Sequence, residues 1–218
     1  MRGGPVMPDL QAGFIPAFLA GLVVNFGIAL WALVGGLLFG LPLAWLRMRQ
    51  GRAGRLAGLM VSPMRTAPTF VVMFFVLNAL PARMSLGGWE FTVTPWLSVV
   101  LSLAVYMCSY VADNAVDAMG HLPAGNRAAA LLFLPGLARA FFVAVLSSGA
   151  GAAVGVAEAI SVTLREVERM PSLKDKVLLM LGVMLFFVLS FQAVYAVLDW
   201  VRRRLNAAPK RPPRKNGR

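Results

Sequence analysis

Five apolar runs, each about as long as a membrane is thick, decide what this chain can fold into. They cover Phe14–Leu46, Leu56–Leu80, Pro95–Ala115, Ala128–Val156 and Val177–Trp200. A helix needs about 20 mostly apolar residues to cross the hydrocarbon core of a bilayer. In lipid, only helices and closed barrels satisfy all their backbone hydrogen bonds, and runs of this length favour helices. The sequence therefore predicts an all-α, polytopic membrane protein with about five transmembrane helices.

The composition excludes a soluble globular protein. Of the 218 residues, 59% are hydrophobic and only 14% are charged, and the mean hydropathy is +0.73. Soluble domains have roughly a quarter of their residues charged. The shortage of charge indicates that lipid is the solvent for most of the surface.

The net charge of +12 reports membrane topology and gives no reason to expect a nucleic-acid partner. The positive residues gather in one connector and at the C-terminal end, beside apolar runs, which is typical of cytoplasmic flanks. Such clusters also attract anionic lipid headgroups. They are Arg47, Arg49, Arg52 and Arg55, and then Arg202, Arg203, Arg204, Lys210, Arg211, Arg214, Lys215 and Arg218.

With these clusters in the cytoplasm, five spans place the N-terminus outside and the C-terminus inside. The basic residues of segment 161–176 oppose this orientation slightly, but three acids dilute them. We expect a multi-pass protein of the bacterial inner membrane. Residues 1–206 would form the transmembrane domain, and residues 207–218 a basic, disordered cytoplasmic tail, because that segment is rich in proline, lysine and arginine.

The sequence predicts no catalytic chemistry, metal site or cofactor. One cysteine, Cys108, excludes an intrachain disulfide and a cysteine-based metal site. The single histidine, His121, is interpreted as a solvated loop residue. No Walker motif is present, so any ATP-driven activity needs a separate ATPase subunit. We therefore do not expect an enzyme.

The polar connector inside Tyr110–Leu131 (YVADNAVDAMGHLPAGNRAAAL) is the most informative segment. A Pro-x-Gly step opens there onto an alanine-rich stretch beside a predicted span. We interpret it as a docking loop for a cytoplasmic partner, with a plain cytoplasmic turn as the alternative. The residues assigned to it are His121, Pro123, Gly125, Asn126, Arg127, Ala129 and Ala130.

Four segments in order resemble the membrane permeases of ABC importers of the polar amino-acid type. GLVVNFGIALWALVGGLLFGLPLAWLR and PMRTAPTFVVMFFVLNALP are similar to the first two helices of that family. VYMCSYVADNAVDAMGHLPAGNRAAA resembles its third helix and coupling loop, and VGVAEAISV the segment before its last helix. The resemblance implies a type I permease fold and alternating access. It also implies three partners: an ATPase dimer, a second permease subunit and an extracytoplasmic solute-binding protein.

The chain departs from the family pattern at several of these positions. Ala128 stands where the coupling motif has glutamate, and Leu134 where it has glycine. Val72 and Val116 replace a usual glutamine and arginine, and about one core helix is missing between Leu146 and Val154. These departures describe a divergent half, which favours a heterodimer with a complete partner.

Three residues are candidates for the substrate pathway: Arg65, Pro68 and Asp113. Ionisable residues inside a membrane are costly and often functional, and an arginine fork suits carboxylates. Arg65 is equally explained as a snorkelling residue at headgroup level, and Asp113 as a solvated acid at a helix end. Pro68, with Pro63, marks either a discontinuous helix of the kind found at transport sites or an ordinary kink.

Two further acids have open interpretations. Asp117 lies four residues after Asp113, on the same helical face if the helix continues that far. Glu158 lines a vestibule or begins a surface helix.

The predicted function is therefore one permease half of an ATP-driven importer for amino acids or similar small polar solutes. The alternative is a degenerate permease-like subunit with a structural or regulatory role. A small secondary carrier is disfavoured, because the spans contain too few ionisable residues for an ion relay.

Overall fold

The computed structural model describes residues 10, 12–49, 51–81, 83–86, 89–121 and 132–206. Helices dominate this part of the chain, and two short strands accompany them. The elements are α1 (Phe14–Met48), α2 (Arg52–Thr66), α3 (Thr69–Ala79), β1 (Arg83–Leu86), β2 (Trp89–Thr92), α4 (Pro95–His121), α6 (Phe133–Ser147), the 3₁₀ helix η1 (Ser148–Val154), α7 (Ala159–Arg169) and α8 (Leu173–Asn206).

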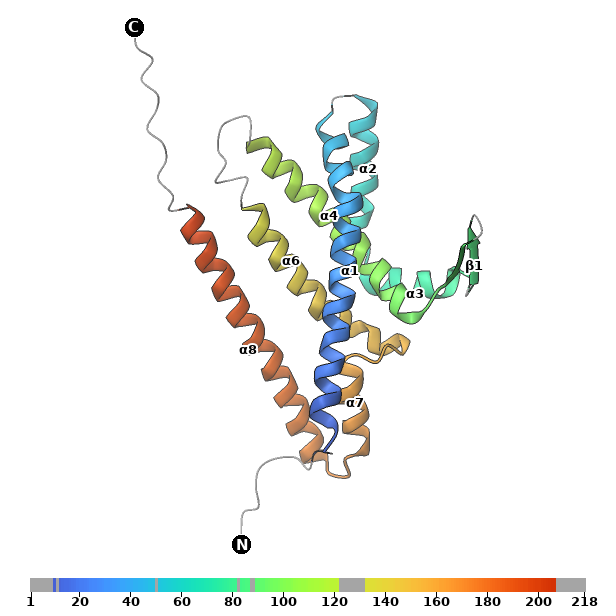
Figure 1. The fold of residues 1–218 in the computed structure, drawn as a ribbon, viewed down its shortest axis with the longest axis vertical. Coiled ribbons are helices and arrows are strands. Elements are labelled where there is room, and N and C mark those ends of the chain that lie inside the picture. Colours follow the sequence, from blue (N-terminus) through green and yellow to red (C-terminus); the bar gives the residue numbers. More distant parts are fainter. Residues whose placement is uncertain are drawn as a thin grey trace.

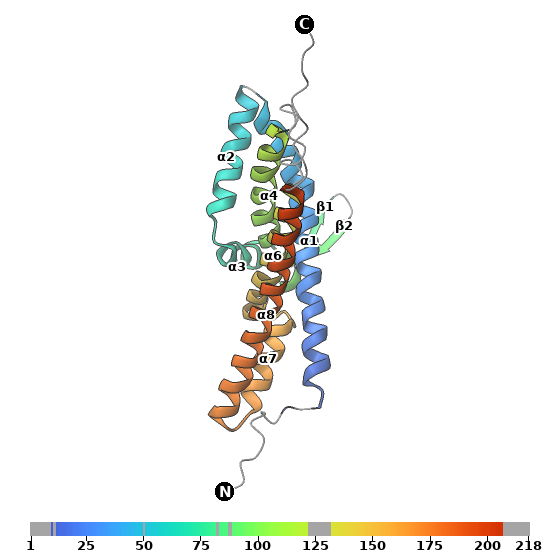
Figure 2. The ribbon, with the colours of Figure 1, turned by 90° about the vertical axis from the view of Figure 1, so that its left-hand side faces the viewer.

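The long helices form an elongated bundle (Figure 1; Figure 2). α1 runs beside α4, α2 packs on the end of α1 where the arginine connector lies, and α7 packs at the opposite end of α1. α8 packs mainly against α6 and α7 and diverges from α1 toward its C-terminal end (Figure 1). Most of the large apolar side chains of α8 are exposed. Such a surface fits lipid or a second membrane subunit rather than water.

The membrane prediction agrees with these elements. Four stretches are long and apolar enough to cross a bilayer: Phe14–Met48, Pro95–His121, Phe133–Val154 and Leu173–Arg204. The bent pair α2 and α3 would make a fifth if it counts as one span. The chain is a multi-pass membrane protein with four to five candidate spans among the described residues, and these spans are all helical.

The second predicted span, Leu56–Leu80, is not one straight helix, and of the two interpretations of Pro68 the structure shows the discontinuous helix. α2 and α3 meet at a bend of 99°. Ala67 and Pro68, the residues between them, are both extended, with ψ angles of 123° and 121°. Proline disfavours the helical conformation at the residue before it, so Pro68 ends α2 at Thr66. Pro63, in contrast, lies inside α2 without interrupting it.

A glycine face brings α1 close to α4. A methyl group added at Gly36 would lie 2.5 Å from the Cβ atom of Met107, and one added at Gly40 would lie 2.7 Å from the carbonyl oxygen of Cys108. Gly35 faces Ala104 at 3.2 Å in the same way. Small residues allow backbones to approach, which is the main source of helix association in lipid.

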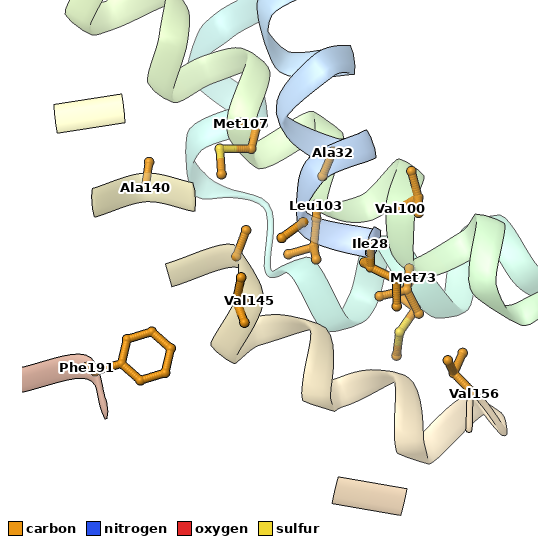
Figure 3. Close-up of a cluster of buried hydrophobic side chains, with 13 residues drawn as sticks. Ile28, Ala32, Met73, Val100, Leu103, Met107, Ala140, Val145, Val156 and Phe191 are labelled. Atoms are coloured by element: carbon orange, nitrogen blue, oxygen red, sulfur yellow. The ribbon is translucent and has the colours of Figure 1, made fainter. Parts of the chain in front are cut away.

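The largest apolar core lies where five helical elements meet (Figure 3). Ile28 of α1, Met73 of α3 and Leu103 of α4 are almost completely buried there, next to Val145 of α6. Phe191 is the member of this cluster that comes from α8, and it stands at the margin of the group. The core therefore holds α1, α3, α4 and α6 together, while α8 is attached at its edge.

A short antiparallel hairpin, β1 with β2, was not predicted. It pairs Arg83 with Thr92 and Leu86 with Trp89, in the connector between α3 and α4. The sequence carries a signal for it, since Gly87 and Gly88 separate two short runs, and paired glycines in that position are typical of hairpins.

The region after Leu146, where the sequence lacks about one helix of the family pattern, is the seven-residue η1. It completes the apolar stretch Phe133–Val154. The basic tail 207–218 lies outside the described residues.

Candidate functional site

Asp113 is the centre of a charge cluster that joins three helices. Its Oδ1 atom accepts a hydrogen bond from Nη1 of Arg47 on α1. Its Oδ2 atom accepts one from Nη1 of Arg65 on α2, at 3.2 Å. The side chain of Asp113 is 27% exposed and that of Arg65 is 61% exposed. The cluster therefore ties α1, α2 and α4 together while Arg65 keeps donors free.

The cluster lies directly beside the break in the second span. Arg65 occupies the last turn of α2, and Pro68 begins α3 two residues after that helix ends. Any swing of α2 about this break has to move Arg65 relative to Asp113. The structure thus brings all three predicted pathway residues, Arg65, Pro68 and Asp113, into one region.

Arg47 is the residue that sequence reasoning missed. It was interpreted only as part of the basic connector, yet it forms the more buried of the two ion pairs with Asp113. A signal existed, because Arg47 follows an apolar run and lies at the same membrane depth as the predicted end of the third span. Which acid it meets depends on packing between helices, and no spacing along the chain encodes that.

The predicted docking loop falls mostly outside the described residues. Pro123, Gly125, Asn126, Arg127, Ala129 and Ala130 belong to segment 122–131, whose structure is not described. His121 is the last residue of α4 and is exposed. The C-terminal end of α4 lies at the same end of the bundle as the connector between α1 and α2 (Figure 1).

A second polar group is buried where α1 meets the start of α7. The side-chain amide of Asn25 donates to Ser148 Oγ at 2.8 Å and to Glu158 Oε2 at 3.0 Å. Its carbonyl oxygen accepts from the backbone N–H of Ala159 at 3.1 Å. The carboxylate of Glu158, which is 0% exposed, also accepts from the backbone N–H groups of Ile160 and Ser161.

This network resolves the open interpretation of Glu158. It is the N-cap of α7 and forms a reciprocal capping box with Ser161. Its negative charge lies at a helix N-terminus, where the macrodipole stabilises an anion. A methyl group at Gly21 would lie 2.5 Å from the backbone N of Ala159, so α1 is in direct contact with this cap. Glu158 therefore begins a helix, as one of its two interpretations held, but it is buried and bound to Asn25, which the sequence did not reveal.

Asp113 and Asp117 both lie on α4, which continues to His121. The two side chains have different surroundings. Asp117 lines a polar cavity of about 300 Å³ between α4, α6 and α8, together with Arg139 and Arg202. The larger cavity, about 530 Å³, lies between α8 on one side and α6, η1 and α7 on the other, and its walls are mainly apolar. Neither cavity includes the Asp113 cluster.

Two solved structures share this arrangement of helices. One is titled a crystal structure of an amino acid ABC transporter with histidines, and it superposes with a TM-score of 0.68 and 20% identity over 88% of this chain and 95% of that chain. The fold is that of an ABC transporter membrane subunit. The other, the MetNI methionine ABC transporter in inward-facing conformations, superposes with a TM-score of 0.62 and 15% identity over 90% and 99% of the two chains.

The likeness to these ABC transporter subunits confirms the predicted resemblance at the level of the fold. No protein-family model and no curated protein matches the sequence. At identities of 20% and 15%, a shared fold leaves function to be argued from the site.

Proposed function

We propose that this chain is a permease subunit of an ATP-driven ABC importer for amino acids or similar small polar solutes. It would form one half of a translocation pathway in the inner membrane, beside a second permease subunit. One observation supports the proposal most: the fold matches ABC transporter membrane subunits over nearly their whole length. The order of the four sequence segments that resemble such permeases supports it independently.

In this proposal the chain is not the enzyme, and a separate ATPase dimer hydrolyses ATP. An extracytoplasmic binding protein delivers the solute. The ATPase acts through the segment from His121 to Ala130, which begins at the C-terminal end of α4. The Arg47–Asp113–Arg65 cluster lies near the same end and links α2 to α1 and α4. Closure of the ATPase would thus reach the break at Pro68 through side chains already in contact.

Purification of the tagged chain from its native membrane, followed by mass spectrometry of the recovered complex, tests this function. We expect an ATPase subunit with a Walker motif and a second permease. Uptake of labelled amino acids by the complex in liposomes, with ATP and the binding protein supplied, then tests transport directly. Recovery of the chain without any ATPase would contradict the proposal.

A subunit that does not translocate is the second candidate, and one observation favours it. Among the described residues, every buried side-chain nitrogen and oxygen already has a hydrogen-bond partner. The larger cavity is mainly apolar, so it offers little to a polar solute.

Arg65→Gln in the reconstituted complex separates the two candidates, with Arg52→Gln as the matched control. If the chain is a permease half, Arg65→Gln should lower the uptake rate about tenfold, the effect of one charge-assisted hydrogen bond. The ATPase should still be recovered with the complex. A structural subunit would keep its uptake rate in both variants.

A further inference from the structure

One face of α8 borders the two cavities described above. The residues of this face follow one another at intervals of three and four. Those from Met180 to Tyr195 line the apolar cavity, and those from Tyr195 to Arg202 line the polar cavity. Tyr195 lines both, so the two cavities meet there. At about 1.5 Å of rise per residue, this face is roughly 33 Å long. That is close to the ~30 Å thickness of a bilayer's hydrocarbon core.

The apolar cavity has room for a hydrocarbon occupant. Its volume of about 530 Å³ falls in the range of roughly 300–1,000 Å³ that is usual for ligand pockets. Val145 of α6, Leu164 of α7 and Met184 and Phe187 of α8 form its walls. Water in such a space gains few hydrogen bonds, so an apolar chain is the favoured occupant.

The polar cavity contains charges of both signs without an ion-pair partner. Arg139 of α6 and Arg202 of α8 line it, as do Asp117 of α4 and Asp199 of α8. Within the described ranges, none of these four groups belongs to an ion pair. The guanidinium of Arg139 lies 4.8 Å from the ring centre of Tyr195, where the two cavities meet. All four side chains are exposed, so a ligand that carries the opposite charges would be held there by charge-assisted hydrogen bonds and not by relief of burial.

We propose that this groove along α8 binds one phospholipid with a zwitterionic, amine-bearing headgroup. The phosphate contacts Arg139 and Arg202, the ammonium contacts Asp117 and Asp199, and an acyl chain passes Tyr195 into the apolar cavity. Basic pockets between transmembrane helices on the cytoplasmic side are known to hold lipid headgroups. The two carboxylates favour a zwitterionic headgroup, because a purely anionic headgroup has no ammonium group to pair with them.

The groove also argues against a helix of a second subunit as the occupant. An apolar helix would fill the larger cavity but would offer no opposite charge to the four exposed charged groups that line the smaller one. A lipid with both an acyl chain and a charged headgroup matches both parts at once.

Native mass spectrometry of the intact complex, reconstituted in equimolar phosphatidylethanolamine and phosphatidylglycerol, tests the proposal. We expect one phosphatidylethanolamine molecule to stay with each copy of this chain after detergent washing. The variant with both Arg139→Gln and Arg202→Gln should retain about tenfold less, since charge-assisted hydrogen bonds to a phosphate have that order of effect. Arg203→Gln is the matched control, because Arg203 is exposed like Arg139 and Arg202 but does not line the cavity; it should retain the lipid.

A second pair of variants tests the acyl chain and keeps the proposal testable if the arginine variant does not assemble. Met184 and Leu185 are about equally exposed, but only Met184 lines the apolar cavity, so Met184→Trp places bulk in the cavity and Leu185→Trp places the same bulk outside it. We expect lipid loss only with Met184→Trp. Three results would overturn the proposal: no lipid retained by the unaltered complex, retention mainly of phosphatidylglycerol, or equal retention in a variant and its control. A disulfide between a cysteine at position 184 and the second permease subunit would also overturn it, because a helix would then occupy the groove.

Discussion

At the scale of single residues, two carboxylates inside the bundle differ in their exposure to water and in the groups that bind them. Asp113 is partly exposed and holds two arginines from different helices. Glu158 is fully buried and is held by neutral donors from Asn25 and the backbone. The first group can exchange partners because water reaches it, whereas breaking the second leaves a buried carboxylate without a donor. We therefore assign adjustable contacts to Asp113 and structural ones to Glu158.

The Arg47–Asp113 pair should contribute measurably to stability. In a double-mutant cycle with Arg47→Gln and Asp113→Asn, we expect a coupling free energy of about 1–2 kcal/mol, as for other partly buried charge-assisted bonds. Thermal unfolding of the purified protein measures it. Arg52→Gln combined with Asp113→Asn is the control and should show additive effects, because Arg52 is exposed and does not belong to the cluster. Additive effects in both cycles would show that Arg47 and Asp113 do not stabilise each other.

Asn25→Asp should destabilise the fold more than the small change in side-chain size suggests. The change replaces the amide that donates to Glu158 with a second carboxylate about as close as the 3.0 Å hydrogen bond it removes. Two buried like charges and a lost donor destabilise by roughly 3–5 kcal/mol. Asn78→Asp is the matched control, since Asn78 donates to a carbonyl of its own helix in an exposed position. We expect a large fall in folded yield and melting temperature for the first variant only.

At the scale of elements, the contact between α1 and α4 depends on glycine positions that differ in their surroundings. Gly36→Ala should weaken the bundle by about 1–3 kcal/mol, the usual cost of overpacking, because its methyl group would lie 2.5 Å from Met107 Cβ. Gly27→Ala, on the same helix, meets nothing within 4 Å and should be neutral or slightly stabilising, since alanine favours helix by about 1 kcal/mol. Comparison of the two unfolding temperatures checks this.

The bend between α2 and α3 should depend on Pro68 more than on Pro63. Pro68→Ala removes the restriction on Ala67 and lets the helix continue locally, so spin labels at the exposed positions 60 and 75 should move apart. Pro63→Ala should leave that distance unchanged, because α2 already passes through Pro63. Cys108 is buried and should stay unlabelled. Identical distance distributions for both variants would mean that packing on α4, rather than proline, sets the bend.

At the scale of the whole molecule, the orientation in the membrane follows from its two ends. Arg55 lies in α2 beside the arginine connector, and Lys174 begins α8 at the opposite end. A membrane-impermeant maleimide added to intact cells should label Lys174→Cys and should reach Arg55→Cys only after lysis. Both positions are exposed, so each serves as the control for the other. The reverse pattern would invert the topology.

The sequence was most informative where a side chain acts through its own helix. The long apolar runs predicted the spans, and Pro63 and Pro68 pointed to a discontinuous helix or a kink, of which the structure shows a break at Pro68. Each of these effects is local. The 99° bend was not predictable, because a proline sets where a helix ends but not the direction of the next one.

What the sequence determined by itself is therefore the solvent, the helical class and the resemblance to ABC permeases, because hydropathy, charge placement and proline act along the chain. The tertiary structure alone decided that Asp113 meets Arg47 and Arg65, that Glu158 is a buried cap held by Asn25, and that one face of α8 borders two cavities. The residues in these contacts are 48 to 133 positions apart. Their meeting depends on how whole helices pack, and helix packing is selected by the summed fit of many side chains rather than by any single spacing.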